Sequence, residues 1–358
     1  SGEQHFPGNG VNSSVRSWPD ALRRGGIDRE ILGILNLHDR VDTVAEDAAR
    51  ESWQSFTNSL TAPKPLRLRV GLIGKYAALR DAYASIEKSV EHCSAMLGCE
   101  TELAWIEADD VDDANAAARF ADVDAVIVPG GFGLRGVEGK VASVRHCRES
   151  GLPYLGICLG FQAAVIEFAR NVMGLEGANS SEFDPNCPYP VIGQLPEQKR
   201  IEQLGGSMRL GGQDVALSPG TLAHWLYEGR TSIRQRFRHR YEVEPEFVER
   251  IEKAGMIFSG RHPAHPIMQM LELPQPVAGA GSGGSEGSAG PKITHPYFVG
   301  AQFHPELVSR PLRPEPLLMG LIAAAIRRKK PDTDLGRWVR TAPTTRSRNG
   351  ASGVASVC

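Results

Sequence analysis

Between residues 68 and 172 the sequence alternates short apolar runs with longer amphipathic stretches. Helical stretches placed between successive buried strands are typical of a parallel sheet that is covered on both faces. The expected strands are 68–73, 101–106, 125–128 and 154–157, and the expected helices are 80–97, 112–120, 137–149 and 161–172. The predicted fold is therefore α/β, with a doubly wound, mostly parallel central sheet and helices on both faces.

Beyond about residue 188 the pattern changes to shorter strands, so we expect an extension of extra strands beside the parallel sheet. The expected segments are strands 208–210, 215–217, 233–243, 256–258, 267–273 and 298–303, followed by a closing helix at 316–327.

Composition along the chain predicts one domain with accessory segments on either side. We expect 1–26 to be disordered or vector-derived, 27–65 to be a weakly helical remnant of a preceding domain with a linker, 66–328 to be the α/β domain, and 329–358 to be a disordered tail. Within the domain, the Gly, Ser and Ala residues of 274–292 predict a flexible insertion.

Charge and cysteine usage exclude several classes of function. The chain has 40 basic and 42 acidic side chains, a formal net charge of −2, which argues against bulk binding of nucleic acid or anionic membranes. No apolar run approaches the roughly 20 residues of a membrane span, and no secretory signal is visible. The six cysteines form no CxxC pair, which disfavours a zinc site. We therefore expect a cytoplasmic protein with reduced thiols and no metal.

Cys158 stands between two glycines, Gly156 and Gly160, where a buried strand gives way to a helix. A glycine-flanked turn of this kind exposes its central side chain at the carboxyl end of the strand. The N–H groups and dipole at the start of the following helix favour a thiolate and a developing oxyanion. A single cysteine in an apolar segment is more often a buried packing residue, but a packing residue does not need the two glycines.

A thiol nucleophile needs a base, and the base needs a group that orients it. His304 and Glu306 follow the expected strand 298–303 and lie two positions apart, on one face of an extended segment. Glu306 is then placed to accept a hydrogen bond from one ring nitrogen while the other faces the thiol. The predicted catalytic set is Cys158, His304 and Glu306.

A second glycine cluster follows the expected strand 125–128, in the stretch 129–136. It contains a G-x-G-x-x-G pattern, but the dinucleotide reading of that pattern requires an acidic residue after the next strand, where this chain has Cys158. The alternative is an oxyanion hole, in which the backbone N–H of Gly131 points at the carbonyl oxygen that the thiol attacks.

Four arginines alternate along 234–240, which places them on one face of a strand. One of them could clamp a substrate carboxylate, while a nucleic-acid patch is disfavoured by the neutral net charge. His262 and His265 are a weak metal signal, because prolines follow both and a third ligand is missing.

Several longer stretches resemble one enzyme family. They are 74–76, 81–85, 129–139, 154–170, 180–183, 204–211, 238–243 and 295–306. Together they are similar to the CTP synthase family, whose C-terminal domain is a class I (triad) glutamine amidotransferase. The resemblance covers roughly residues 66–328 and implies that family's doubly wound fold.

The resemblance also assigns roles to residues of this chain. It implies that Cys158 is the nucleophile, His304 the base and acid, and Glu306 its orienting partner, with Gly131 and Leu159 forming the oxyanion hole. The glutamine-binding residues that it implies are Gly131, Phe132, Leu159, Gln162, Glu182 at the substrate ammonium and Arg240 at the substrate carboxylate. Arg135 and Glu138 match residues implicated in the activation of the family by GTP.

The implied reaction is hydrolysis of L-glutamine to glutamate and ammonia through a thioester, without a cofactor. In the family the ammonia serves a synthetase domain that uses ATP, Mg²⁺ and UTP, and the full enzyme is expected to be a homo-oligomer. No GxxxxGK[ST] phosphate loop occurs here, so this chain alone is expected to hydrolyse glutamine and not to make CTP. Residues 235–244 depart from the family's ERHRHRYEVN at Gln235, Phe237 and Glu244, which is expected to alter the wall near the GTP site.

Two other functions stay open. The first is the glutaminase part of another class I amidotransferase, or a γ-glutamyl peptidase, which the stretches 180–183, 204–211 and 238–243 disfavour. The second is a catalytically silent module with a role in regulation or filament assembly, which the intact set of Cys158, His304 and Glu306 disfavours.

Overall fold

A nine-stranded sheet forms the centre of the computed structural model, which describes residues 15–75, 80–194, 209–276 and 293–338. The strand order is β2-β1-β3-β4-β12-β11-β10-β7-β8. The bounds are β1 (Arg67–Gly74), β2 (Glu100–Glu107), β3 (Ala125–Val128), β4 (Tyr154–Ile157), β7 (Arg209–Leu217), β8 (Ser232–His239), β10 (Ile257–Arg261), β11 (Met268–Glu272) and β12 (Phe298–Ala301).

The first five strands of this order are parallel, and the remaining strands pair in the antiparallel sense. β3, β4 and β12 are buried on both faces, as expected of strands in the middle of a layered sheet. Because parallel strands end at the same edge, β3, β4 and β12 deliver the residues that follow them to one place. The glycine loop, the thiol and the imidazole all follow these strands.

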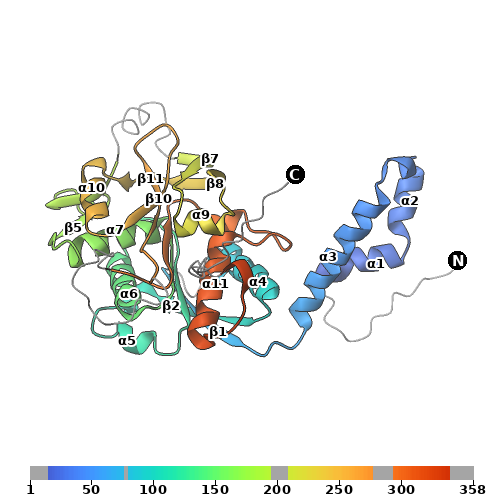
Figure 1. The fold of residues 1–358 in the computed structure, drawn as a ribbon, viewed down its shortest axis with the longest axis horizontal. Coiled ribbons are helices and arrows are strands. Elements are labelled where there is room, and N and C mark those ends of the chain that lie inside the picture. Colours follow the sequence, from blue (N-terminus) through green and yellow to red (C-terminus); the bar gives the residue numbers. More distant parts are fainter. Residues whose placement is uncertain (1–14, 76–79, 195–208, 277–292, 339–358) are drawn as a thin grey trace, which may run out of the picture.

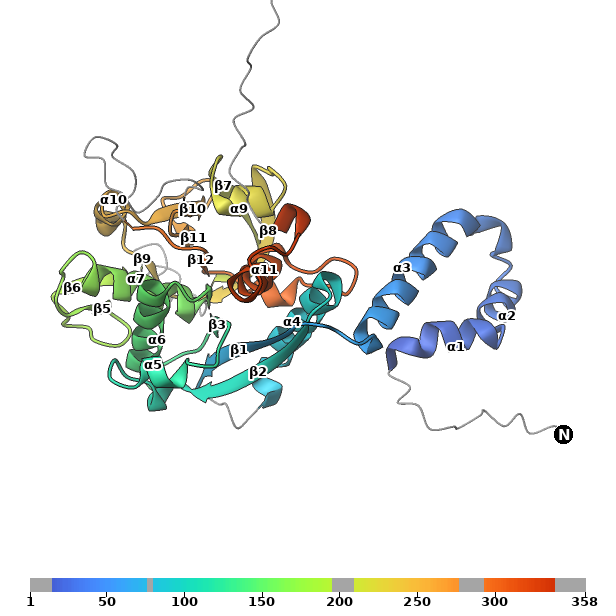
Figure 2. The same ribbon diagram turned by 60° about the horizontal axis from the view of Figure 1, so that its bottom comes forward.

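Helices cover both faces of the sheet (Figures 1 and 2). The pair α4 (Ala84–Leu97) and α11 (Pro316–Lys329) packs on one face, and α6 (Val137–Ser150) and α7 (Leu159–Asn171) pack on the other. Each pair contributes to a separate hydrophobic core, because alternate side chains of the strands point to opposite faces. The predicted fold class is confirmed.

A second, three-stranded sheet has the order β5-β6-β9 and lies at the end of α7. Its strands are β5 (Ala178–Ser180), β6 (Tyr189–Gly193) and β9 (Glu242–Val243). The remaining short helices of the body are α5 (Ala116–Arg119), α9 (Leu222–Leu226) and α10 (Pro245–Lys253). The predicted strand 233–243 is therefore wrong as a single element, because the chain leaves the large sheet after His239 and joins the small one at Glu242. The strands predicted separately at 208–210 and 215–217 belong to one strand, β7.

The N-terminal helices α1 (Trp18–Arg24), α2 (Ile27–Ile34) and α3 (Thr43–Thr61) stand to one side of the α/β body (Figures 1 and 2). The predicted disorder of 1–26 is wrong for α1. A proline in the first turn and arginines in the last turn favour this helix, and Arg23 pairs with Asp47 of α3. Residues 1–14 lie outside the described part of the chain.

The predicted disorder of 329–358 is also wrong at its start. Leu335 is buried, and the backbone oxygen of Arg337 accepts a hydrogen bond of 3.0 Å from the Trp225 indole. The rest of that segment, 339–358, and most of the predicted flexible insertion, 277–292, lie outside the described residues. Within the ranges that the structure describes, no helix combines the length and apolar character needed to cross a membrane.

Candidate active site

Cys158 occupies a strained turn between β4 and α7. Its φ of 53° and ψ of −100° lie where a non-glycine residue is rarely found. The backbone is held there because the Cys158 N–H donates to Ala301 at 2.7 Å and the Gln162 N–H donates to the Cys158 carbonyl at 3.1 Å. Strain of this kind persists where the surroundings over-determine the conformation.

The flanking glycines are required by close packing at this turn. A Cβ on Gly160 would lie 2.1 Å from the carbonyl oxygen of Val128, and a Cβ on Gly156 would lie 2.7 Å from the carbonyl oxygen of Gly160. Both distances are far below van der Waals contact, so only glycine lets α7 start this close to β3 and β4. The G-x-C-x-G pattern thus reflects a steric demand of the turn.

His304 and Glu306 lie beside this turn, on the segment that follows β12. The Nδ1 atom of His304 is 2.8 Å from Oε1 of Glu306, and the His304 N–H donates to the Arg236 carbonyl at 2.8 Å. The Cβ position of Gly130 lies 3.0 Å from Cε1 of His304 and 3.8 Å from Sγ of Cys158, so ring and thiol border the same glycine. The structure therefore brings together the three residues predicted as the catalytic set.

The surroundings of His304 favour its protonated form. Burial lowers the pKa of the imidazole, but interactions with Cys158 and Glu306 more than offset burial and raise the pKa to about 10. Nε2 of His304 is buried and has no hydrogen-bonding partner among the described residues, and the Cys158 thiol donates to the Arg238 carbonyl at 3.8 Å. A cationic imidazole beside a thiol favours the thiolate.

A cavity of about 390 Å³ opens onto Cys158. Its walls come from the loop after β3, the start of α7, the segment after β5, the end of β8 and the segment between β8 and β9. The lining residues are Gly131, Phe132, Cys158, Gln162, Glu182, Arg238, His239, Arg240 and Tyr241. Six of these belong to the predicted site, although they are spread over more than 100 positions of the sequence.

The cavity carries one anionic and one cationic group of the predicted glutamine site. Glu182 is half-buried, and its Oε1 accepts a hydrogen bond of 3.2 Å from the Gly133 N–H. Burial raises the pKa of this carboxyl, while the Gly133 N–H and the charges of Lys75 and Arg240 act in the opposite direction. Arg240 is exposed at the cavity, at the point where β8 ends. This pair matches the opposite charges of a free amino acid.

Two further predicted residues, Leu159 and Gln162, lie in the first turns of α7. Leu159 is buried at the start of α7, and its Cδ2 lies 3.5 Å from the Cβ position of Gly131. Gln162 lines the cavity, but its side-chain nitrogen already donates to the Tyr241 carbonyl at 3.0 Å and to Gln302 Oε1 at 3.3 Å. Gln162 therefore also ties the start of α7 to the 240–241 segment.

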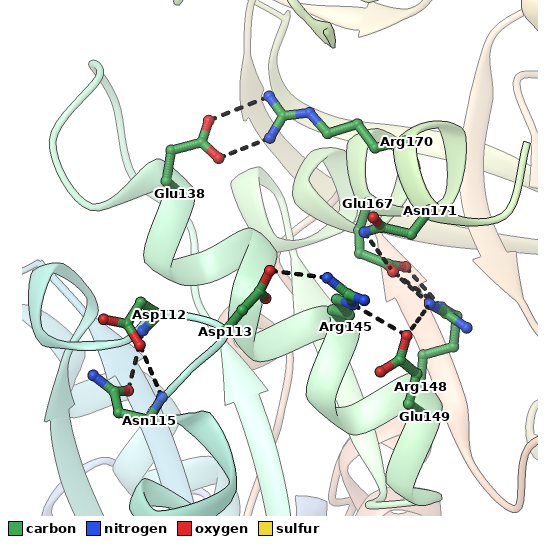
Figure 3. Close-up of polar contacts among 10 residues, drawn as sticks. All are labelled: Asp112, Asp113, Asn115, Glu138, Arg145, Arg148, Glu149, Glu167, Arg170 and Asn171. Carbon is green, nitrogen blue, oxygen red and sulfur yellow. Dashed lines mark hydrogen bonds and ion pairs between the residues drawn. The ribbon is translucent and has the colours of Figure 1, made fainter. Parts of the chain in front are cut away.

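The two residues assigned to the GTP response do not line this cavity. Arg135 donates to Asp109 at 2.8 Å and to the carbonyl oxygen of Lys75 at 2.6 Å. Glu138 forms a two-pronged ion pair with Arg170 of α7 at 2.7 and 3.2 Å (Figure 3). Both side chains thus bind other protein groups and not the cavity.

Sequence reasoning missed three lining residues, Arg238, His239 and Tyr241. The alternating pattern of 234–240 could have indicated Arg238, because that residue lies on the same face of β8 as Arg236 and two positions before Arg240. Gln235 and Phe237, where the chain departs from the family, are buried and do not line this cavity.

Two alternatives weighed from the sequence find no support in the geometry. The loop 129–136 precedes α6, but the strand after it ends at Cys158 and not at an acidic residue. His262 and His265 lie with ring centroids 4.8 Å apart, and no group of three or more metal-binding side chains is found among the residues described.

The family profile described as glutamine amidotransferase class-I matches residues 78–280. CTP synthase from Archaeoglobus fulgidus is 41% identical over 314 residues, which is 87% of this chain and 53% of that protein. CTP synthase from Staphylococcus aureus is 43% identical over 317 residues, covering 88% of this chain and 54% of that protein. The chain thus spans about half the length of the curated relatives that it matches.

A solved structure of the glutaminase domain of Trypanosoma brucei CTPS, with bound acivicin, superposes with a TM-score of 0.64 at 29% identity. The match covers 77% of this chain and 98% of that domain.

Proposed function

The chain belongs to the class I glutamine amidotransferase family and is homologous to the glutaminase domain of CTP synthases, and from that premise we propose that it hydrolyses L-glutamine to glutamate and ammonia. The proposed catalytic residues are Cys158, His304 and Glu306. The proposal includes residues 66–328 as the glutaminase domain, with the helices before it as the end of a synthetase domain.

In the first half-reaction the Cys158 thiolate attacks the side-chain amide carbon of glutamine. The backbone N–H groups of Gly131 and Leu159 stabilise the oxyanion that forms. Gly131 lines the cavity beside the thiol, and Leu159 directly follows Cys158 at the start of α7. His304, held by Glu306 through Nδ1, donates the proton that lets the amide nitrogen leave as ammonia. The product on the enzyme is a γ-glutamyl thioester.

In the second half-reaction water replaces ammonia. His304 removes a proton from the water, the hydroxide adds to the thioester carbon, and the carbon–sulfur bond breaks to release glutamate. The sulfur leaves as a thiolate and His304 keeps the proton taken from water, so the starting protonation of both residues is restored. Glu182 and Arg240 hold the substrate ammonium and carboxylate throughout, which keeps the side-chain amide at the thiol.

The observation that carries the proposal is that the Cys158 thiol, the Glu182 carboxylate and the Arg240 guanidinium line the same cavity. Cys158 alone would fit any thiol enzyme of this fold. Glu182 and Arg240 at the same cavity favour a substrate with a free α-amino and a free α-carboxyl group. A γ-glutamyl peptidase or another amidotransferase shares part of this chemistry, so the substrate needs a direct test.

The test is covalent capture by a chloroketone analogue of glutamine. We expect one adduct per chain, located at Cys158 by peptide mass mapping, and protection by excess L-glutamine. The other described cysteines, Cys93, Cys99, Cys147 and Cys187, are internal controls, because none of them lines the cavity. Cys158→Ala should show no adduct. A folded wild-type sample without an adduct at position 158 would refute the proposal.

We also propose that the ammonia serves ATP-dependent amination of UTP to CTP, within pyrimidine biosynthesis, on a synthetase domain that uses Mg²⁺. The names of the relatives support this role. GTP activation through Arg135 and Glu138, a cytoplasmic location and homo-oligomeric assembly of the full enzyme belong to the same proposal. Adding a separate CTP synthetase domain should yield glutamine-dependent CTP, which another amidotransferase would not support.

A further inference from the structure

Two lysines are buried beneath the glycine loop that borders the thiol. Lys140, near the start of α6, is 0% exposed, and its ammonium donates to the Pro129 carbonyl at 2.7 Å. Lys75, directly after β1, is 3% exposed, and its ammonium donates to the Phe132 carbonyl at 2.7 Å and to the Gly133 carbonyl. The two side chains thus hold the loop 129–136 at two points, its first residue and its middle.

Both side chains converge on Gly131. The Cβ position of Gly131 lies 3.8 Å from Nζ of Lys140 and 3.8 Å from Cε of Lys75. Among the described residues, neither ammonium has a carboxylate within ion-pairing distance, so each is satisfied by carbonyl oxygens of the loop. Burying an ammonium without a close ion-pair partner costs free energy, and for Lys75 the nearby charges of Glu182 and Asp109 offset only part of the effect of burial on the pKa. This arrangement needs a functional reason.

Peptide geometry shows what the two lysines fix. In a trans peptide the carbonyl and the N–H point in opposite directions. Lys75 binds the carbonyl of the Phe132–Gly133 peptide, and the N–H of that same peptide donates to Glu182. Lys140 binds the carbonyl of the Pro129–Gly130 peptide, so the Gly130 N–H points away from α6. The Gly130–Gly131 peptide, which supplies the proposed oxyanion donor, lies between these two fixed points.

We propose that Lys140 and Lys75 are positioning residues of the glutaminase site, acting on two different peptides of one loop. Lys140 fixes the peptide before Gly131, which presents its N–H to the oxyanion, and places a positive charge near it. Lys75 fixes the Phe132–Gly133 peptide, which orients Glu182 toward the substrate ammonium. The inference rests on the proposed glutaminase function. It assigns Lys140 to the reaction rate and Lys75 to substrate binding.

The charge of Lys140 is coupled to the nucleophile. Burial, with repulsion from Lys75, lowers the pKa of Lys140 to about 7, and the Cys158 charge acts to raise it. The coupling is reciprocal, so protonated Lys140 favours the thiolate and loses that effect as pH rises through its pKa. A lysine that only filled space would leave the pH dependence unchanged.

The experiment uses the full chain and the chloroketone analogue of glutamine, with alkylation rates measured over a range of concentrations. We expect Lys140→Met to lower the saturating rate constant at least about tenfold with a small change in the half-saturating concentration. Lys75→Met should do the reverse, raising the half-saturating concentration about fivefold or more with a small change in rate constant.

The control is Lys253→Met, which removes an exposed lysine of α10 that pairs with Glu249. Lys140→Gln keeps a hydrogen-bond donor without the charge, so it should recover part of the rate lost in Lys140→Met. The wild-type rate should fall as pH rises above about 7, and this step should be missing in both Lys140 variants. Lys140→Gln also serves if the methionine variant does not fold.

The outcomes distinguish failure of this inference from failure of the proposed glutaminase function. Wild-type rate constants and an unchanged pH profile in the Lys140 variants would overturn the inference while leaving the glutaminase function intact. Equal effects of both lysines on both constants would overturn the division of roles. Absence of alkylation in the wild-type chain would instead refute the proposed function.

Discussion

His304 is the residue at which burial and charge compete most strongly in this site. Burial alone would keep its ring neutral, yet the contacts with Cys158 and Glu306 raise its pKa to about 10. The folded protein therefore holds the imidazole charged over most of the physiological range, while the unfolded chain titrates near the ordinary value of about 6.5. A charged imidazole stabilises the thiolate and is ready to protonate the leaving nitrogen.

Replacing Glu306 with glutamine should lower the pKa of His304, because the ring loses a negative partner while its burial is unchanged. We expect the glutaminase rate to fall about 10²–10⁴-fold, as the imidazole loses both orientation and charge stabilisation. NMR titration of the His304 ring would measure the pKa shift directly, and ammonia release would measure the rate.

The same change has a predictable effect on stability. A folded pKa raised above the unfolded value stabilises the protein fully below about pH 6.5, and this contribution disappears as pH rises through about 10. Glu306→Gln should therefore cost more stability at pH 6 than at pH 10, as measured by urea unfolding. A constant difference across this range would contradict the predicted pKa.

Helices α6 and α7 connect the two halves of the site, because α6 follows the glycine loop and α7 begins directly after the nucleophile. They are joined by an ion pair between Arg148 and the fully buried Glu167, with hydrogen bonds of 2.8–3.0 Å (Figure 3). Asn171 adds a hydrogen bond of 3.1 Å to the same carboxylate. This contact fixes α7 relative to α6 on the face of the sheet opposite α4 and α11.

Glu167→Gln should destabilise the chain by about 3 kcal/mol, because it leaves the largely buried Arg148 guanidinium with its exposed partner Glu149 alone. Urea unfolding would measure this free energy. Arg145→Ala is the matched control, since it removes two exposed ion pairs of the same helix, to Asp113 and Glu149 (Figure 3), and should cost below about 1 kcal/mol. Equal losses for both variants would show that burial of the pair is not what matters.

The whole molecule consists of an α/β body and a set of N-terminal helices with few buried contacts to it. Phe56 is the buried residue of α3, with its ring centroid 6.2 Å from that of His92 of α4, and α1 and α2 contain no buried residue. Arg16 adds an ion pair to Glu91 and accepts a hydrogen bond from Trp53. The two hydrophobic cores lie in the body.

Deleting residues 1–61 should therefore leave the body folded and able to form the Cys158 adduct. We expect the midpoint of thermal unfolding to shift by only a few degrees, because the deletion removes about one buried side chain from the packing. Circular dichroism during heating and the alkylation rate would measure the effect. A shortened chain that aggregates or loses alkylation would show that the helices are an integral part of the domain.

The sequence by itself determined the parallel half of the sheet and the position of the nucleophile. Buried strands, helical periodicity and paired glycines are local signals, and the packing at Gly156 and Gly160 shows the steric demand behind the last of them. The small β5-β6-β9 sheet and the break between β8 and β9 had no comparable signal, because short strands depend on partners distant in the sequence. The resemblance to a family supplied Glu182 and Arg240 where local patterns could not.

Only the tertiary structure decided what lies beneath the glycine loop. Nothing in the spacing of Lys75 and Lys140 indicates that their ammonium groups meet under Gly131, since one follows β1 and the other belongs to α6. The parallel strand order brings these segments to one edge of the sheet, and burial then leaves the two ammonium groups dependent on loop carbonyls for hydrogen bonds. Charge interactions of this kind are set by distance and solvent exclusion, which a linear sequence does not encode locally.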